Sequence, residues 1–436
     1  MDLNVLQQFI HTDRDHIRTH IANIPAADIA TLVEHLKGEA DRHWFINANR
    51  SLELADAIIA IGAECGCSTY TALGTMARGD ALQFLGRFAE AWEALDEAGR
   101  LYTQQGDELG WARTRIGRLL LSVDMQCVPQ ATADAELART IFERHGNHQK
   151  QVTLDLNLGV VYYSLGDQLQ ALRSYRRALN TAEVLQASPA SPHSLGSDIA
   201  LLHNNMGISY DLLGDFQQAL ACYERAYACF VTRNEFVGVA LVESNMAHVA
   251  MAQGNFRRAL HLLHQARDHY QAENHHLDAT HASRDMVECF LALNRYAEAR
   301  ELAASLIEEY RQACSPYYQG LVLLHAATAN GELGHYEAAL AALDEACELF
   351  RSIDAHALIA TAQLRQGQIA LRRGQFVLAR QTATAAAQGC AAAGRNLESA
   401  RATLLLGQAQ FALGEISEAA RCGRLALSVA QAQNIP

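Results

Sequence analysis

The stretch TLDLNLGVVYYSLGDQLQALRSYRRALNTAE, residues 153–183, decides the fold. Its first half repeats apolar residues at helical spacing, at Leu156, Leu158, Val161, Tyr162 and Leu165. The pair Gly166-Asp167 then breaks this pattern, and a second apolar stripe follows at Leu169, Leu172, Tyr175, Ala178 and Leu179. Two apolar stripes at helical spacing on either side of a glycine turn predict a helix, a tight turn and an antiparallel helix.

The same unit recurs along the chain, as two columns of small residues show. The first column is Ala91, Ala131, Ala171, Ala219, Ala259, Ala299, Ala339, Ala379 and Ala419. Every step is 40 residues except one of 48, where the Pro/Ser-rich piece SPASPHSLGS is inserted at 188–197. The second column lies seven residues later, at Ala98, Ala138, Ala178, Ala226, Ala266, Leu306, Ala346, Ala386 and Ala426. A fixed period of this size predicts stacked helical hairpins, an architecture that offers extended binding surfaces.

These residues resemble the tetratricopeptide repeat (TPR) family. One unit carries the family pattern as Leu158-Gly159, Tyr162, Gly166, Leu169, Ala171, Tyr175 and Ala178; the next carries it as Met206-Gly207, Tyr210, Gly214, Phe216, Ala219, Tyr223 and Ala226. The resemblance implies an all-α, right-handed α-solenoid of about nine TPR helix-turn-helix hairpins with a helical N-terminal cap. The 40-residue period is similar to the TPR arrays of kinesin light chains, of the maltose-regulon activator family and of bacterial CHAT (caspase-like) proteins.

The two ends and the second unit depart from the pattern. We expect residues 1–70 to form a helical N-terminal cap with a degenerate repeat and residues 71–436 to form the solenoid. Within the cap we expect a helix near 2–22, a break at Pro25 and a helix from about Asp28. The unit from Gly117 to Phe142 lacks the turn glycine and contains Pro129, which predicts an irregular hairpin. The last helix, about 416–432, is apolar on two sides, so we expect self-association or a following domain there.

Composition excludes several functional classes. The formal net charge is -13 with no basic block, which argues against nucleic-acid binding. No signal peptide and no apolar stretch of about 18 residues is evident, so we expect no membrane span. The ten cysteines are scattered through helical patterns, as reduced core residues of a cytoplasmic protein would be.

Motifs for catalysis are missing from the sequence. It contains no HExxH, Walker A, GxSxG or CxxC motif, so we expect neither an enzyme nor a cofactor. His261 and His264 share one helical face, but no cysteine or carboxylate completes a tetrahedral ligand set, and we expect no metal.

One polar column points to a binding surface. It lies two residues before the glycine of the Leu-Gly pair in successive first helices, and its members are Asn157, Asn205, Asn245, Asp285, His325 and Arg365. Two nearby polar residues, Asn204 and His248, are also candidates for binding. Further candidates are Asp211, Arg284, Glu288, Gln368, Arg115 and Arg118. In the TPR family, first helices line the inner groove and asparagines there hold the backbone of an extended peptide. An amide side chain both donates and accepts, which suits a peptide group in either direction. The alternative is structural, with asparagines bonded to a neighbouring helix and charges on a solvated face.

The sequence therefore predicts a non-catalytic protein-interaction array whose concave groove binds an extended peptide or a partner domain. The alternative is a regulatory or sensor arm of a larger CHAT-type caspase-like peptidase system. That alternative rests on the resemblance of residues 85–102 and 106–119, LGRFAEAWEALDEAGRLY and GDELGWARTRIGRL, to TPR arrays that precede CHAT domains.

Overall fold

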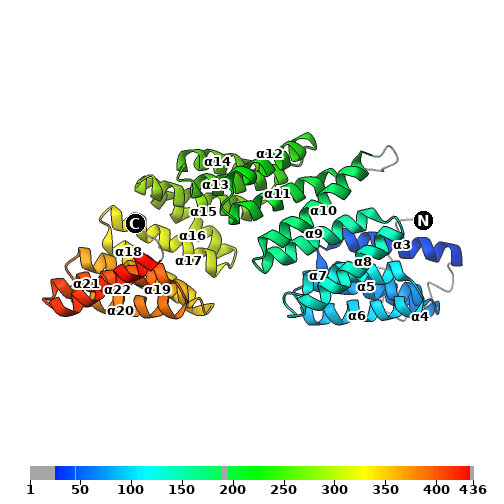
Figure 1. The fold of residues 1–436 in the computed structure, drawn as a ribbon, viewed down its shortest axis with the longest axis horizontal. Helices are drawn as coiled ribbons and strands as arrows, with labels where there is room; N and C mark the ends of the chain where they lie inside the picture. The colour runs from blue at the N-terminus through cyan, green and yellow to red at the C-terminus, as the bar shows by residue number, and fades with distance from the viewer. Residues whose placement is uncertain (1–24, 45, 188–194, 433–436) are drawn as a thin grey trace. The chain divides into compact units, whose positions relative to one another are not determined.

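The chain folds as consecutive helical hairpins (Figure 1). The computed structural model describes residues 25–44, 46–187 and 195–432, and all regular secondary structure in these ranges is helical. The helix expected near 2–22 lies outside the described residues, as do residues 188–194 of the Pro/Ser-rich insertion. Nine hairpins follow one another from Ser68 to Ala432, so the hairpin architecture read from the sequence is confirmed. Odd-numbered helices are the first helices of their hairpins, and even-numbered helices are the second.

Two compact units make up the chain, one of residues 1–233 and one of residues 234–436. The helices of unit 1 are α3 (Ala26–His43), α4 (Ala48–Glu64), α5 (Ser68–Phe84), α6 (Phe88–Gln104), α7 (Glu108–Leu121), α8 (Val128–Arg144), α9 (His148–Ser164), α10 (Gln168–Gln186), α11 (Gly196–Leu212) and α12 (Phe216–Thr232). Those of unit 2 are α13 (Phe236–Ala252), α14 (Phe256–Ala272), α15 (His276–Ala292), α16 (Tyr296–Gln312), α17 (Pro316–Glu332), α18 (Tyr336–Ser352), α19 (His356–Arg372), α20 (Phe376–Ala392), α21 (Asn396–Ala412) and α22 (Ile416–Ala432).

A three-residue link joins most neighbouring helices, and residues 165–167 show how it works. Leu165 ends α9, and Gly166 takes a left-handed conformation with a φ of 78°. The amides of Gly166 and Asp167 then donate to the carbonyls of Tyr163 and Tyr162, both at 2.9 Å, which satisfies the end of the helix. The carboxylate of Asp167 accepts from the amide of Gln170 at 3.1 Å and caps α10. One short link therefore ends one helix and begins the next.

This link explains the 40-residue period. Most helices have 17 residues, as α13 and α14 do, and positive φ angles recur in the links at Gly214, Gly254 and Asn294. Two 17-residue helices and two three-residue links complete one repeat. Asparagine replaces glycine at position 294 because its side chain tolerates the left-handed region better than most.

The small-residue columns lie at the helix contacts. Ala171, Ala219 and Ala259 are fully buried, as are Ala178 and Ala226 of the second column. A larger side chain at these positions would push neighbouring helices apart, since protein interiors are close-packed. The alanine columns therefore mark the positions at which second helices pack against their neighbours.

The second hairpin departs from the repeat where the sequence predicted it. Helix α7 has only 14 residues, its link contains Gln126 at a φ of 53°, and Pro129 lies in the first turn of α8. At the N-terminal end, Pro25 precedes α3. Helices α3 and α4 form a further hairpin with its own apolar core, in which Leu32, Leu36 and Ile58 are fully buried.

First helices contact the first helices of the next hairpins within each unit. These contacts join α3 to α5, α5 to α7 and α7 to α9 in unit 1, and α15 to α17, α17 to α19 and α19 to α21 in unit 2. We call the surface that the first helices form on the side away from the second helices the inner face of each unit. None of the described helices is long and apolar enough to cross a membrane.

Candidate functional site

The predicted polar column lies on first helices in both units. In unit 1, Asn157 of α9 lines a cavity that α3, α5 and α7 also form. Asn204 of α11 is buried, and its Nδ2 donates to Oδ1 of the half-buried Asn205 at 3.4 Å. Asn205 is therefore the more accessible of the two neighbours.

Unit 2 brings its column residues into contact between consecutive first helices. Nε2 of His248 in α13 lies 2.8 Å from Oδ2 of Asp285 in α15. The other oxygen of Asp285 accepts from Nε and Nη2 of Arg284, at 2.9 and 2.6 Å. Asp285 is thus the centre of a hydrogen-bonded group that joins α13 to α15, while Asn245 lies half-buried one turn before His248.

Two neighbouring carboxyls of α15, those of Asp285 and Glu288, differ in their electrostatics. Burial alone would raise the pKa of Asp285, but the hydrogen bond from His248 and the charge of Arg284 outweigh it and lower the pKa. Burial and the negative charge of Asp285 instead raise the pKa of Glu288, one turn later. Asp285 is therefore a fixed negative charge, and Glu288 is a carboxyl that binds a proton more readily.

The column continues on α17 and α19 with groups that lack a counter-ion. Burial, helped by the positive charges of Arg365 and Arg284, lowers the pKa of His325 to about 4, and its Nδ1 is buried without a described partner. Burial also lowers the pKa of Arg365. Nη1 of Arg365 donates to the carbonyl of Leu324 at 3.5 Å, and no carboxylate in the described part of the chain pairs with it. This end of the row presents a neutral imidazole and an uncompensated guanidinium.

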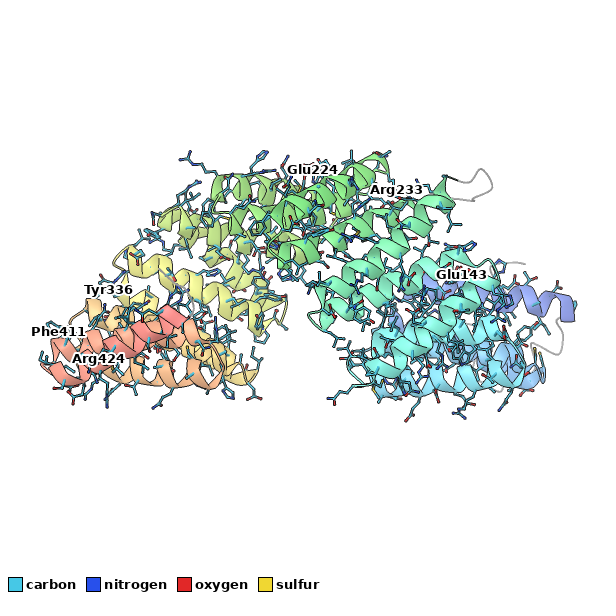
Figure 2. All side chains as sticks on the ribbon, viewed as in Figure 1. Glu143, Glu224, Arg233, Tyr336, Phe411 and Arg424 are labelled. Carbon is cyan, nitrogen blue, oxygen red and sulfur yellow. The ribbon has the colours of Figure 1, made fainter. Side chains whose placement is uncertain are left out.

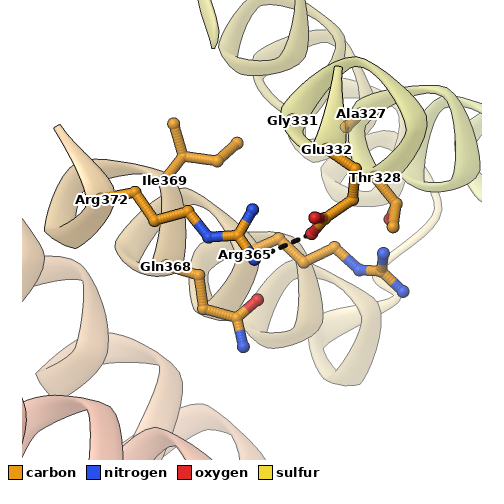
Figure 3. A pocket seen from close by; sticks show the side chains of 8 residues that line it. All are labelled: Ala327, Thr328, Gly331, Glu332, Arg365, Gln368, Ile369 and Arg372. Atoms are coloured by element: carbon orange, nitrogen blue, oxygen red, sulfur yellow. Dashed lines mark ion pairs between the residues drawn. The ribbon is translucent and has the colours of Figure 1, made fainter. Parts of the chain in front are cut away.

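A small hollow of about 50 Å³ lies beside Arg365 between α17 and α19 (Figure 3). Arg372 reaches across it to Glu332, with Nη2 and Oε1 2.8 Å apart, and Gln368 lies between the two arginines in sequence. The side chain of Arg365 extends toward Thr328 of α17. The hollow therefore has one arginine with a carboxylate partner and one without.

A second polar column, which the sequence reasoning missed, lies two residues before the first. Its members are buried: Arg115, Asp155, His203, Glu243 and Ser283. Three of them pair with the second helix of their own hairpin: Arg115 with Asp134 at 3.2 Å, Asp155 with Arg177 at 2.8 Å, and Glu243 with His269 at 2.9 Å. Two residues on a helix are about 200° apart, so this column points into the hairpin and the first points away from it. Polar residues that recur at the 40-residue period were the sequence signal that could have revealed this column.

Arg115 and Arg118 are both buried and contact second helices, so they do not lie on the inner face as expected from sequence. The Arg118 guanidinium lies 4.0 Å from the ring centre of Trp92 and pairs with Asp96 at 3.2 Å, and both partners are in the second helix α6. Arg115 lies 4.7 Å from the ring centre of Trp111. Ion pairs and aromatic rings within and between hairpins therefore account for these two charges.

Within the described ranges, no three His, Cys, Asp or Glu side chains are grouped so that they could hold a metal ion. His248 and Asp285 could supply two metal ligands, but the third side chain beside them is the cation Arg284. The site on the inner face is thus one of hydrogen-bond donors, acceptors and charges.

Comparisons with known proteins agree with this architecture. Sequence profiles described as tetratricopeptide repeat match residues 200–230, 250–323 and 324–393. No curated protein matches the sequence.

Several solved structures share the fold. The apo form of RapI is 12% identical with a TM-score of 0.63, covering 83% of this chain and 97% of that one. The STAND protein PH0952 from Pyrococcus horikoshii, described as having a tetratricopeptide repeat sensor, is 14% identical with a TM-score of 0.59. The match covers 81% of this chain and 51% of PH0952. A Rap protein in complex with competence and sporulation factor is 12% identical with a TM-score of 0.50, covering 83% and 98% of the two chains.

These matches give no support to the resemblance to CHAT arrays, and identities this low show the fold alone. The repeat profiles, the hairpin geometry and the structural similarity agree with one another. The chain therefore carries an array of tetratricopeptide repeats.

Proposed function

We propose that the chain is a non-catalytic protein-interaction array, and that its inner face binds an extended peptide of a partner protein. The observation that carries the proposal is the row of polar side chains on four consecutive first helices of unit 2. His248, Asp285, His325 and Arg365 come from α13, α15, α17 and α19. We further propose that residues 1–70 cap the array, which begins at residue 71.

The spacing of the row suits an extended ligand. Packed helices lie about 8–10 Å apart, and an extended chain rises about 3.3 Å per residue. Each first helix would therefore face about three residues of a bound peptide, and four helices would face about twelve. The repeated polar groups can then meet repeated peptide groups along the ligand.

The chemistry of the row favours a polar peptide with an acidic residue facing α19. Asp285 already has His248 and Arg284 as partners, whereas Arg365 has a partly desolvated charge without a carboxylate in the described structure. A ligand carboxylate at Arg365 would supply the missing counter-ion, and charge-assisted hydrogen bonds of this kind are among the stronger ones. The similar fold of the Rap protein bound to competence and sporulation factor supports ligand binding by such an array.

The test selects peptides from a random library on the immobilised full chain. The peptides have about twelve residues, because the spacing of the four helices sets this length. Enriched peptides are then measured by fluorescence anisotropy against the full chain and two variants. Arg365→Gln should weaken binding by about 10-fold or more, since a hydrogen bond to a charged group is lost. Arg424→Gln, an exposed arginine of the second helix α22, should leave the affinity unchanged. Failure to enrich any sequence, or equal losses in both variants, would contradict the proposal.

A further inference from the structure

The use of lysine in this chain is uneven. Of its 35 basic residues only Lys37 and Lys150 are lysines, and the rest are arginines. The two lysines lie on α3 and α9, far apart in sequence, yet both line the same cavity in unit 1. This cavity, which we call the lysine cavity, has a volume of about 210 Å³ and is formed by the first helices α3, α5, α7 and α9 together with Trp44, which follows α3.

A glycine lines the lysine cavity on α7. Gly117 of α7 occupies the position that carries Asn157 in the next repeat. A Cβ atom at position 117 would lie 3.2 Å from Oδ1 of Asp80 and 2.9 Å from Leu95. The glycine therefore lets Asp80 of α5 and Leu95 of α6 approach α7 closely, and α7 puts no side chain into the cavity at this position.

One wall of the lysine cavity is aromatic. The rings of Trp44 and Phe84 are stacked, with centroids 5.8 Å apart and an interplanar angle of 16°. Ile116 and Leu120 of α7 extend the apolar wall. Nε1 of Trp44 is buried, and no partner for it lies in the described part of the chain. A flat apolar group could stack here and leave a polar atom within reach of the indole.

The charged groups around the wall are predominantly cationic. Lys37 pairs with Asp41 on α3. Arg113 of α7 and Lys150 of α9 line the same cavity as Asp80. Burial raises the pKa of Asp80 to about 6, despite the opposing charges of Lys37 and Lys150. Partial desolvation and the charge of Lys37 lower the pKa of Lys150. Asp80 is therefore still mostly ionised at pH 7, but the three cations of the cavity outnumber its two carboxylates among the described residues.

We propose that the lysine cavity binds an organic carboxylate carried on a flat apolar group, with the carboxylate near Lys150 and Arg113 and the apolar body against Trp44 and Phe84. Such a group can belong to a free aromatic acid or to a peptide in which an acidic residue precedes an aromatic one. The cavity lies wholly within unit 1 and shares no residue with the row on unit 2. The site therefore stands independently of the peptide binding proposed for unit 2.

Binding of such a ligand takes up a proton. A carboxylate beside Asp80 disfavours the charged form of Asp80 and raises its pKa further above about 6. The other charged groups that line the cavity with Asp80 are Lys37 and Asp41 from α3, Arg113 from α7 and Lys150 from α9. At pH 7 the ligand should therefore bind with proton uptake, which calorimetry detects as a heat that depends on the ionisation enthalpy of the buffer.

The two lysines make the site directly observable. Reductive methylation of the full chain with ¹³C-formaldehyde labels only Lys37, Lys150 and the N-terminal amine, and dimethyl-lysine keeps its charge. Indole-3-acetate is the probe, and tryptamine has the same ring with a positive charge. We expect both lysine signals to shift with indole-3-acetate along one saturation curve, with a Kd of about 1 mM or tighter. Lys37→Arg and Lys150→Arg assign the signals.

Variants test whether the lysine cavity is the binding site, and a peptide probe tests whether the ligand is a free acid or a peptide. Lys150→Gln should weaken binding of indole-3-acetate to the unlabelled chain by about 10-fold or more, and Arg424→Gln should not. Gly117→Asn should abolish binding, and a circular dichroism melt checks that it folds. Tighter binding of N-acetyl-Asp-Trp-amide than of indole-3-acetate identifies a peptide ligand, and the reverse identifies a free acid. Unmoved lysine signals, equal shifts with tryptamine, or an unaffected Lys150→Gln variant overturn the proposal.

Discussion

The ring of Tyr175 in α10 lies directly against the backbone of Gly159 in α9. A Cβ atom at position 159 would be 2.2 Å from a ring carbon of Tyr175, which is almost fully buried. The next hairpin repeats the arrangement, where a Cβ at Gly207 would lie 2.5 Å from the ring of Tyr223. The Leu-Gly position of the repeat is therefore a packing requirement set by the aromatic residue of the partner helix.

Gly159→Ala should lower the free energy of unfolding by about 1–3 kcal/mol, because the added methyl group overpacks the Tyr175 contact. This loss should appear although alanine is the better helix former by about 1 kcal/mol. Gly38→Ala is the matched control, since a Cβ at Gly38 in α3 meets nothing within 4 Å. Urea denaturation of both variants measures the difference. A Gly159→Ala variant as stable as Gly38→Ala would show that the ring does not occupy this position.

Stability should fall as the pH is lowered from about 6.5 to about 4 because His325 stays neutral in the folded chain. Its pKa is lowered from 6.5 to about 4 by burial and by two arginines, so the unfolded chain binds the proton first. Protonation of the unfolded state over this window destabilises the fold by up to about 3 kcal/mol.

His325→Gln removes this group and should flatten the stability curve between pH 6.5 and 4 relative to the wild-type chain. His356→Gln, at an exposed position at the start of α19, is the control and should keep the wild-type slope. Chemical denaturation at several pH values provides the measurement. Identical slopes for wild type and His325→Gln would refute the buried environment of this histidine.

The last hairpin exposes apolar side chains that should cause self-association. Phe411, labelled in Figure 2, is 66% exposed, and Leu425 and Leu427 of α22 are 56% and 57% exposed. Replacing both leucines with glutamate should lower the mass measured by light scattering if this surface joins two chains. A far-ultraviolet circular dichroism spectrum confirms that α22 stays helical. A wild-type chain that is monomeric at all concentrations would contradict the prediction.

The sequence was a sufficient guide to the hairpins because each is encoded locally. Gly166 and Asp167 end one helix and cap the next within three residues, so the link repeats wherever these residue types repeat. Prolines mark helix starts for an equally local reason, since proline has no amide proton to leave unpaired: Pro25 directly precedes α3, and Pro129 lies in the first turn of α8. Fold class and period follow from such short-range rules.

The direction of a polar side chain was harder to predict. Arg115 and Asn157 both lie on first helices, but the former points into its hairpin and the latter to the inner face. Their positions in the repeat differ by two residues, and only the packing of the second helix shows which is buried. The lysine cavity was not predicted because it depends on Lys37, Asp80 and Lys150 coming together from three different hairpins.

The peptide binding proposed for unit 2 is tested most directly by the variant Arg365→Ala, because Arg365 is the member of the row without a carboxylate partner in the described structure. Two quantities are measured together: the affinity for a library-selected peptide and the thermal midpoint of unfolding. If Arg365 bonds a carboxylate of the peptide, its truncation should cost about 1–3 kcal/mol, or about 5- to 150-fold in affinity. Asn180→Ala, on the exposed face of the second helix α10, is the control and should change neither quantity. The account predicts lost affinity with an unchanged midpoint, and a large drop in midpoint or full retention of the peptide would contradict it.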